Sequence, residues 1–180
     1  GISLHDYSSN NIIIGNNIAN NLFGILLSSS KNRISGNNIT NNDYGISLVS
    51  SSNIISGNNI TNNNHGIRLY SSSYVSIVGN NITVNNLHGI WLEYSSNNII
   101  SGNNITNNCN GISLHYSSDN SIVENNIANN QYGISLHKYS SNNIISGNNI
   151  TNNDYGISLH DYSSNNIIIG NNIANNLFGI

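Results

Sequence analysis

The dipeptide Gly-Ile recurs along this chain of 180 residues at intervals of 21 to 23 residues. It begins at Gly1, Gly24, Gly45, Gly66, Gly89, Gly111, Gly133, Gly156 and Gly179. Residues 1–25 and 156–180 are identical, which indicates duplication within a repeat array. A unit this short cannot bury a hydrophobic face alone, so the period predicts a solenoid that is stabilised by stacking.

Each repeat reads G-I-x-L, then a polar turn ending in Ser-Ser, then N-x-I, G-N-N-I and a segment such as T-N-N. Leucine-rich repeats have a similar period but need several Leu per unit, and helical repeats need about 33 residues or more. Asn, Ser, Gly and Ile are also weak helix formers. The repeat therefore favours β-structure.

The spacing of apolar residues predicts the shape of one coil. Side chains alternate along a strand, so inward residues of one strand lie an even number of positions apart, as Ile2 and Leu4 do. The steps from Leu4 to Ile13, from Ile13 to Ile18 and from Ile18 to Ile25 are all odd, and each implies a corner. We therefore expect an all-β chain: a single-stranded parallel β-helix of about eight coils, with three short strands per coil.

Corner and ladder residues follow from the same pattern. The Gly before Asn-Asn suits a corner that needs a positive φ, and Glu124 occupies this place in one coil, where φ should be negative or mildly strained. Asn11, Asn16 and Asn20 fall near inward or corner positions. Because a buried amide is costly unless it is paired, we expect equivalent Asn side chains to pair between coils.

The composition excludes several classes of function. Charged residues make up 6% of the chain, the net charge is −3 with four Lys and Arg, and there is one Cys and no Met. These features exclude a nucleic-acid-binding surface and an internal disulfide framework, and no apolar run is long enough to insert in a membrane. We expect residues 1–180 to form one β-helix domain that is a fragment of a longer array.

One unit carries a family resemblance. Tyr-Ser-Ser-Asn-Asn-Ile-Ile-Ser-Gly-Asn-Asn-Ile-Thr-Asn-Asn stands at residues 94–108 and again at 139–153. It resembles the right-handed parallel β-helix repeats of the NosD-like family, a family linked to periplasmic copper binding, whose relatives occur in secreted and cell-surface proteins, many of them archaeal. The resemblance implies a right-handed coil and an extracellular or cell-surface location.

Acidic residues do not indicate catalysis. Glycoside hydrolysis needs two carboxyl groups about 5–10 Å apart. The acidic residues fall at different repeat positions and at distant coils: Asp6, Asp43, Glu93, Asp119, Glu124, Asp154 and Asp161. The chain also lacks the charged cluster of the carbohydrate-acting β-helix enzymes to which it is similar, so we expect no enzyme activity and no cofactor.

Three histidines are candidate metal ligands. His115, His137 and His160 occupy the same repeat position on consecutive coils, and imidazoles about 5 Å apart could share a copper, zinc or nickel ion. The absence of Met and the isolated Cys109 argue against a Cu(I) site. The alternative is an exposed ladder copied by duplication.

A second candidate site is aromatic and charged. Arg68 and Trp91 replace the usual Ser of G-I-S-L on adjacent coils, with Glu93 and Tyr94 close by. An exposed Trp beside Arg and Tyr suits stacking on a sugar or contact with a protein partner. The alternative is local drift, with aromatic stacking that stiffens the corner.

These observations lead to a ranked expectation. The first is a structural, non-catalytic module of a cell-surface or secreted protein, such as a rod, surface layer, sheath or filament, that associates with itself end to end or with other surface-protein domains. The alternative is a module that binds a glycan or partner through Arg68, Trp91, Glu93 and Tyr94. Metal binding rates lower, as does ice binding by the Asn-x-Thr face, which Ala19, Ala128 and Ala174 interrupt.

Overall fold

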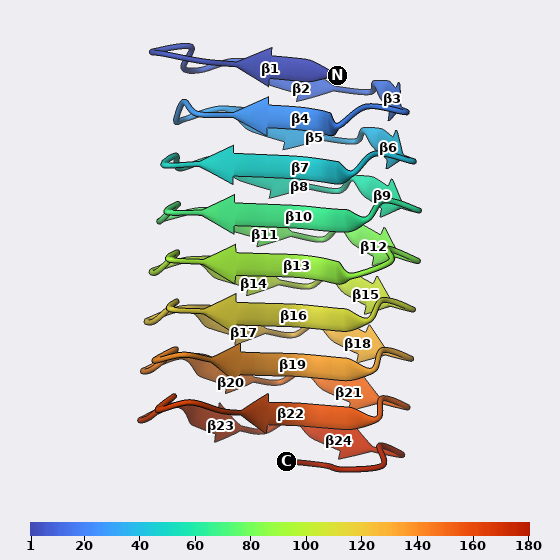
Figure 1. Ribbon diagram of the computed structural model, residues 1–180, viewed down its shortest axis with the longest axis vertical. Helices are drawn as coiled ribbons and strands as arrows, with labels where there is room; N and C mark the ends of the chain where they lie inside the picture. The colour runs from blue at the N-terminus through green and yellow to red at the C-terminus, as the bar shows by residue number, and fades with distance from the viewer.

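The computed structural model describes all residues from 1 to 180 and is an all-β solenoid of eight stacked coils without any helix (Figure 1). Each coil contributes three strands, and equivalent strands pair in parallel to form three sheets of eight strands. The predicted parallel β-helix with three strands per coil is therefore confirmed. No helix is present that could cross a membrane.

Sheet A holds the long strands, which carry the G-I-x-L motif. They are β1 (Ile2–Leu4), β4 (Phe23–Leu27), β7 (Tyr44–Val49), β10 (His65–Tyr70), β13 (His88–Glu93), β16 (Asn110–His115), β19 (Tyr132–His137) and β22 (Tyr155–Leu159). Residues at the same repeat position face each other across neighbouring coils, as Ile67 faces Ile90 and Leu69 faces Leu92. The register therefore stacks like residues in columns along the axis.

Sheets B and C are built of three-residue strands. Sheet B consists of β2 (Ile12–Ile14), β5 (Arg33–Ser35), β8 (Ile54–Ser56), β11 (Ser76–Val78), β14 (Ile99–Ser101), β17 (Ser121–Val123), β20 (Ile144–Ser146) and β23 (Ile167–Ile169). Sheet C consists of β3 (Asn17–Ala19), β6 (Asn38–Thr40), β9 (Asn59–Thr61), β12 (Asn81–Thr83), β15 (Asn104–Thr106), β18 (Asn126–Ala128), β21 (Asn149–Thr151) and β24 (Asn172–Ala174).

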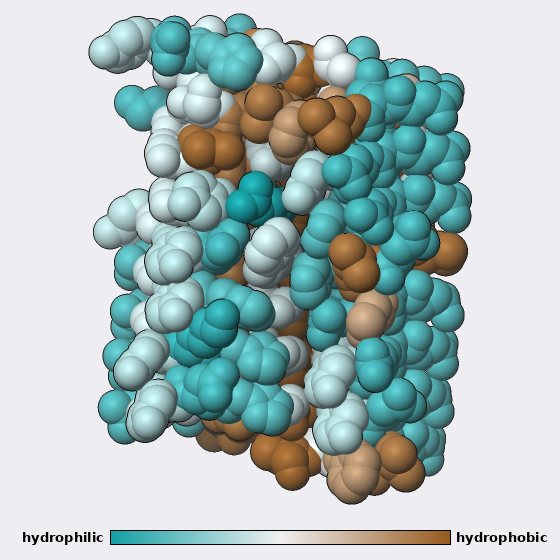
Figure 2. Space-filling model, viewed as in Figure 1, coloured by the Kyte–Doolittle hydropathy of each residue, from teal (hydrophilic) through white to brown (hydrophobic).

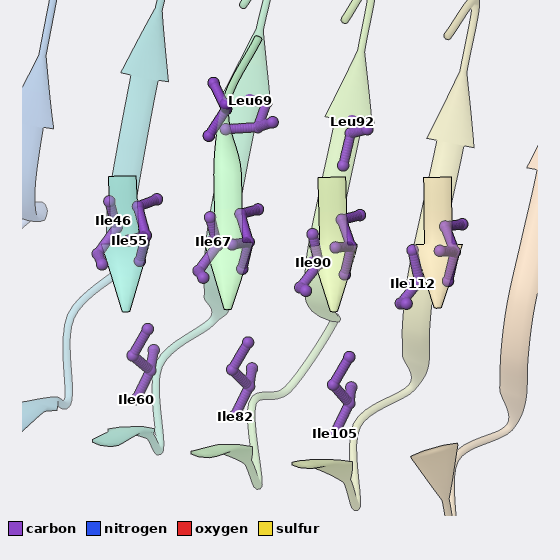
Figure 3. Close-up of a cluster of buried hydrophobic side chains, with 14 of the residues drawn as sticks. Ile46, Ile55, Ile60, Ile67, Leu69, Ile82, Ile90, Leu92, Ile105 and Ile112 are labelled. Carbon is purple, nitrogen blue, oxygen red and sulfur yellow. The ribbon is translucent and has the colours of Figure 1, made fainter. Parts of the chain in front are cut away.

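The hydrophobic core runs the length of the solenoid between the three sheets. It is one cluster of 28 buried residues, nearly all Ile and Leu. Figure 3 shows Ile67 and Ile90 of sheet A stacked in one ladder, and Ile82 and Ile105 of sheet C stacked in another. Burial of one such side chain contributes about 1.5–3 kcal/mol. The inward positions are those that the parity of the sequence predicted.

Buried Asn side chains join the coils at the corners. The Oδ1 atom of Asn37 accepts hydrogen bonds from the backbone N–H and the Nδ2 of Asn16, at 3.0 and 2.9 Å. Its own Nδ2 donates to the Ile13 carbonyl at 2.9 Å and to the Asn58 Oδ1 at 3.0 Å. Each amide is paired, so its burial does not carry the cost of an unsatisfied polar group.

Two sequence expectations about corners need correction. The third Asn ladder runs through Asn21, whose Nδ2 donates to the Asn42 Oδ1, whereas the expected Asn20 turns the corner with a φ of 62°. Glu124 has a φ of 55°, close to the 70° of Gly15, so the backbone strain is real and a negative φ is wrong. Stacking imposes the same turn on every coil, whatever residue occupies it.

Candidate functional site

The outer face of sheet A, which points to the viewer in Figures 1 and 2, carries the most varied side chains of the protein. Polar residues cover most of this view, and apolar residues gather near its ends, over β4 and β22 (Figure 2). At the central position of G-I-x-L most coils have Ser, but β10 has Arg68 and β13 has Trp91, and these two residues face each other across the strands. Register alone therefore makes them neighbours.

Arg68 is the centre of this face. Its guanidinium carbon lies 4.9 Å from the ring centroid of Trp91, 5.0 Å from that of Tyr70 and 5.7 Å from that of Tyr44. Its Nη2 donates to the Glu93 Oε2 at 2.9 Å, which is the only ion pair in the structure. Each cation–π contact contributes about 0.5–2 kcal/mol. The arginine is thus fixed in place and its charge is neutralised.

A column of rings lies beside Arg68, formed by the residues that precede Gly-Ile. Phe23 stacks on Tyr44 with 5.1 Å between centroids, and Tyr44 stacks on His65 at 4.8 Å. His65 lies 5.3 Å from both His88 and Trp91. The column forms because the residue before Gly-Ile is repeated in register on each coil. We name the set Tyr44, His65, Arg68, Tyr70, Trp91 and Glu93 the aromatic patch.

Polar atoms without partners are concentrated at this patch. Six buried side-chain polar atoms in the structure lack a hydrogen bond. Five of them lie at or beside the patch: Ser47 Oγ, His65 Nδ1, Arg68 Nε, His88 Nδ1 and Trp91 Nε1. Such atoms are rare because burial without a partner is costly. The patch is therefore where buried hydrogen-bonding groups without partners gather, and a ligand reaches them only if side chains move.

Burial keeps the imidazoles of this region neutral. It lowers the pKa of His88 to about 4, with a smaller effect from the neighbouring His65, His115 and His137. Burial is also the main cause that lowers the pKa of His65; Arg68 acts in the same direction and Asp43 opposes it. Each neutral ring offers one donor and one acceptor at pH 7. The patch therefore combines aromatic surface and neutral hydrogen-bonding groups around one neutralised cation.

Acid is expected to destabilise the protein through His88. The pKa is about 4 in the folded protein against an ordinary 6.5, so between these values the unfolded chain binds more protons. The free energy of unfolding therefore decreases as the pH is lowered from 6.5 to 4, by up to about 3 kcal/mol for His88. Urea unfolding measured at intervals from pH 7.5 to 4 would record it.

The repeat itself supplies the control for this experiment. Tyr44 and Tyr132 occupy the same position as His65 and His88 in other coils. The double variant His65→Tyr/His88→Tyr should keep the stacking and lose the part of the decrease that these two histidines cause. Burial also lowers the pKa of His115 and His137, which should account for the remainder. An equal decrease in the variant would assign the acid sensitivity to other groups.

The three candidate metal ligands form a stack on sheet A. The ring centroids of His115 and His137 are 5.1 Å apart, and those of His137 and His160 are 4.9 Å apart. The Nε2 atoms of His137 and His160 each lie 2.6 Å from a Ser Oγ, of Ser135 and Ser158. No group of three or more His, Cys, Asp or Glu side chains is arranged to hold a metal ion. Metal binding here stays a prediction from the sequence.

The structure brings three of the four predicted patch residues together. Arg68 contacts both Trp91 and Glu93, whereas Tyr94 lies at the next corner, stacked on Tyr116 at 4.9 Å. Tyr94 reaches the patch only through the edge of Tyr70, at 6.0 Å. Sequence reasoning missed Tyr44, although its place before Gly-Ile in the coil preceding His65 was a usable signal.

A family model gives the broadest comparison with known proteins. The model described as "Right handed beta helix region" matches residues 1–60 and 23–173. It supports the right-handed coil that the repeats imply, and no comparison singles out the narrower NosD-like branch. No curated protein matches the chain in sequence.

Solved structures of similar architecture are β-helix enzymes. A mutant of the periplasmic alginate epimerase AlgG has a TM-score of 0.78 at 23% identity, over 87% of this chain and 45% of that one. The A-module of the Azotobacter vinelandii mannuronan C-5 epimerase AlgE4 has a TM-score of 0.67 at 17% identity, over 89% and 61%. DFA-IIIase from Arthrobacter chlorophenolicus, without its lid, has 0.65 at 17%, over 73% and 33%. The chain thus spans less than half of the AlgG chain.

This comparison contradicts the expectation that the chain has no enzymatic role, since the structures that it resembles are enzymes. The expectation rested on the absence of a charged cluster and on the scattered acidic residues. Their scatter bears only on hydrolysis by a pair of carboxyl groups, and it leaves proton transfer by other side chains open.

Proposed function

The chain belongs to the family of right-handed β-helix proteins, and from this premise we propose that it binds a polysaccharide on the outer face of sheet A. The observation that carries the proposal is the aromatic patch, in which Arg68 is held between Tyr44, Tyr70 and Trp91 and paired with Glu93. An extracellular or periplasmic location is part of the proposal, and the periplasmic AlgG among the similar structures supports it.

The chemistry of the patch suits sugar hydroxyl groups. Saccharide sites combine aromatic surface, which covers the apolar face of a sugar ring, with a few fixed polar groups. The patch has both, and its charges cancel between Arg68 and Glu93. The unpaired polar atoms of His65, Arg68 and Trp91 are the groups that hydroxyls would satisfy after small side-chain movements.

The similar structures give independent support for a polysaccharide. Two of them are named for alginate and mannuronan, both polymers of sugars. A solenoid presents equivalent positions at intervals of about 4.8 Å along its axis, so an extended polymer can contact several coils at once. Polysaccharide binding of this kind is compatible both with a carbohydrate-active enzyme and with a non-catalytic binding module.

Replacing patch residues with the Ser of other coils tests the proposal. Trp91→Ser and Arg68→Ser recreate positions such as Ser113 and Ser47, so the variants should remain folded. We expect Trp91→Ser to weaken binding of a matching polysaccharide at least tenfold, as measured by titration calorimetry after a glycan array has identified the ligand.

The control is Ser158→Ala in strand β22, which lies on a coil far from the patch. This variant should bind the polysaccharide as tightly as the parent protein does. The proposal fails if the folded parent binds no polysaccharide on the array. It also fails if Trp91→Ser and Arg68→Ser bind as tightly as the parent.

A further inference from the structure

A second candidate site lies away from sheet A, at the corner that joins sheets A and B. This corner forms the loops at the left of Figure 1. On the second to fourth coils it contains a groove of about 380 Å³. The groove is lined mainly by Lys31, Arg33, Ser52, Ile54 and Tyr74. Its volume lies within the range of small-ligand sites, which is about 300–1,000 Å³.

Positive charge is concentrated in this groove. The chain has four Lys and Arg residues in all, and two of them, Lys31 and Arg33, line it. Both side chains are exposed, and neither forms an ion pair, because the only ion pair joins Arg68 to Glu93. In a protein with a net charge of −3, the groove is thus a local concentration of positive charge, which attracts anions.

The shape of the groove comes from a small residue between two large ones. Lys31, Ser52 and Tyr74 occupy one corner position on consecutive coils: the Lys31 N–H donates to the Ser52 carbonyl at 2.7 Å, and the Ser52 Oγ donates to the Tyr74 carbonyl at 2.9 Å. Two coil steps place Lys31 and Tyr74 about 10 Å apart. Tyr74 lines the groove and is 74% exposed, so its side chain is open to a ligand.

The backbone at the two walls is strained. Lys31 has a φ of 63° and Tyr74 a φ of 58°. Four other coils have Asn at this position with the same left-handed backbone: Asn10, Asn97, Asn142 and Asn165. Asn adopts this conformation more readily than Lys or Tyr does. The coils that depart from Asn for Lys or Tyr are the two whose residues form the walls of the groove.

We infer that this groove binds the carboxylate-bearing ring of an acidic sugar residue. Lys31 and Arg33 would hold the carboxylate, the arginine through two parallel hydrogen bonds, and the exposed Tyr74 ring would cover the apolar face of the sugar. The choice of a saccharide rests on the proposed function, but the site is separate from the aromatic patch. The patch is charge-neutral and suits hydroxyl groups, whereas the groove supplies two free cations.

Tetragalacturonate and the neutral maltotetraose are the probes, with binding followed by calorimetry at low and high salt. The variants take residues from the first coil: Lys31→Asn/Arg33→Ile copies Asn10 and Ile12. We expect at least a tenfold loss of tetragalacturonate binding in this double variant, and the residual binding should depend less on salt.

The variant Tyr74→Asn should also bind tetragalacturonate more weakly. Because Asn relieves the backbone strain, Lys31→Asn and Tyr74→Asn should melt no lower than the parent.

The outcomes separate this inference from the proposed function. Tetragalacturonate binding that is lost in Trp91→Ser but unchanged in Lys31→Asn/Arg33→Ile would overturn the groove and leave the patch standing. The reverse result would support the groove alone. Equal competition by inorganic phosphate would show a general anion site and overturn the assignment to an acidic sugar, as would the absence of any binding by the parent.

Discussion

Replacing Ile100 with Asn is expected to destabilise the protein by about 4–6 kcal/mol, enough to unfold a marginally stable domain. Ile100 is fully buried in the sheet B ladder between Ile77 and Ile122. The substitution removes apolar contacts and places an amide where no partner is available. Urea unfolding followed by circular dichroism would measure the loss.

The matched control is one residue away. Ser101 is only partly exposed but points outward, at a position that other coils fill with Val or Ile, so Ser101→Asn should change the stability by less than about 0.5 kcal/mol. Comparable losses in the two variants would contradict the assignment of inward and outward positions. A stable Ile100→Asn protein would do the same.

The 180-residue chain on its own is expected to associate end to end as its concentration rises. The outer edge of β1 at one end, and those of β23 and β24 at the other, present backbone groups available for pairing, and such edges template further strands. Phe178 and Gly179 already pair with the first part of β22, so only the rest of that edge is open. Ile2 and Leu4 at one end match Ile157 and Leu159 at the other, since residues 1–25 and 156–180 are identical. Few charges are available to oppose the contact.

Sedimentation velocity over a range of concentrations would detect this association. A coil rich in Lys and Glu added to one end should limit assembly to dimers, and coils added to both ends should give monomers. A stable monomer at high concentration without added coils would contradict the prediction, and it would also weaken the case for a self-assembling rod.

The sequence predicted the coil, the three strands and the inward ladders because these depend on period and parity alone. It misplaced the third Asn ladder because Asn20 and Asn21 are adjacent and identical, and only the corner conformation distinguishes them. The aromatic patch was predicted from Arg68 and Trp91, but the membership of Tyr44 was not. The contacts of Tyr44 depend on the direction of the Arg68 side chain, which repeat spacing does not encode.

The groove was missed for a related reason. Lys31 and Tyr74 are 43 positions apart (74 − 31) and belong to coils of different length, so their shared corner position is hidden in the sequence. The strand pairing aligns them, because it fixes which residues are equivalent from coil to coil.

The Asn ladders also determine where a coil can change its length. Consecutive ladder residues within a coil are always five positions apart, as Asn98, Asn103 and Asn108 are. The connection from the long strand to the first ladder position varies: five residues from Leu27 to Asn32, six from Leu92 to Asn98 and seven from Leu136 to Asn143. Two sides of the triangle therefore have a fixed length. Insertions occur on the third side, mostly at the corner after the long strand and once before it, where Asn85 and Gly89 are four positions apart, against three from Asn108 to Gly111. New specificities can arise in these loops without disturbing the scaffold.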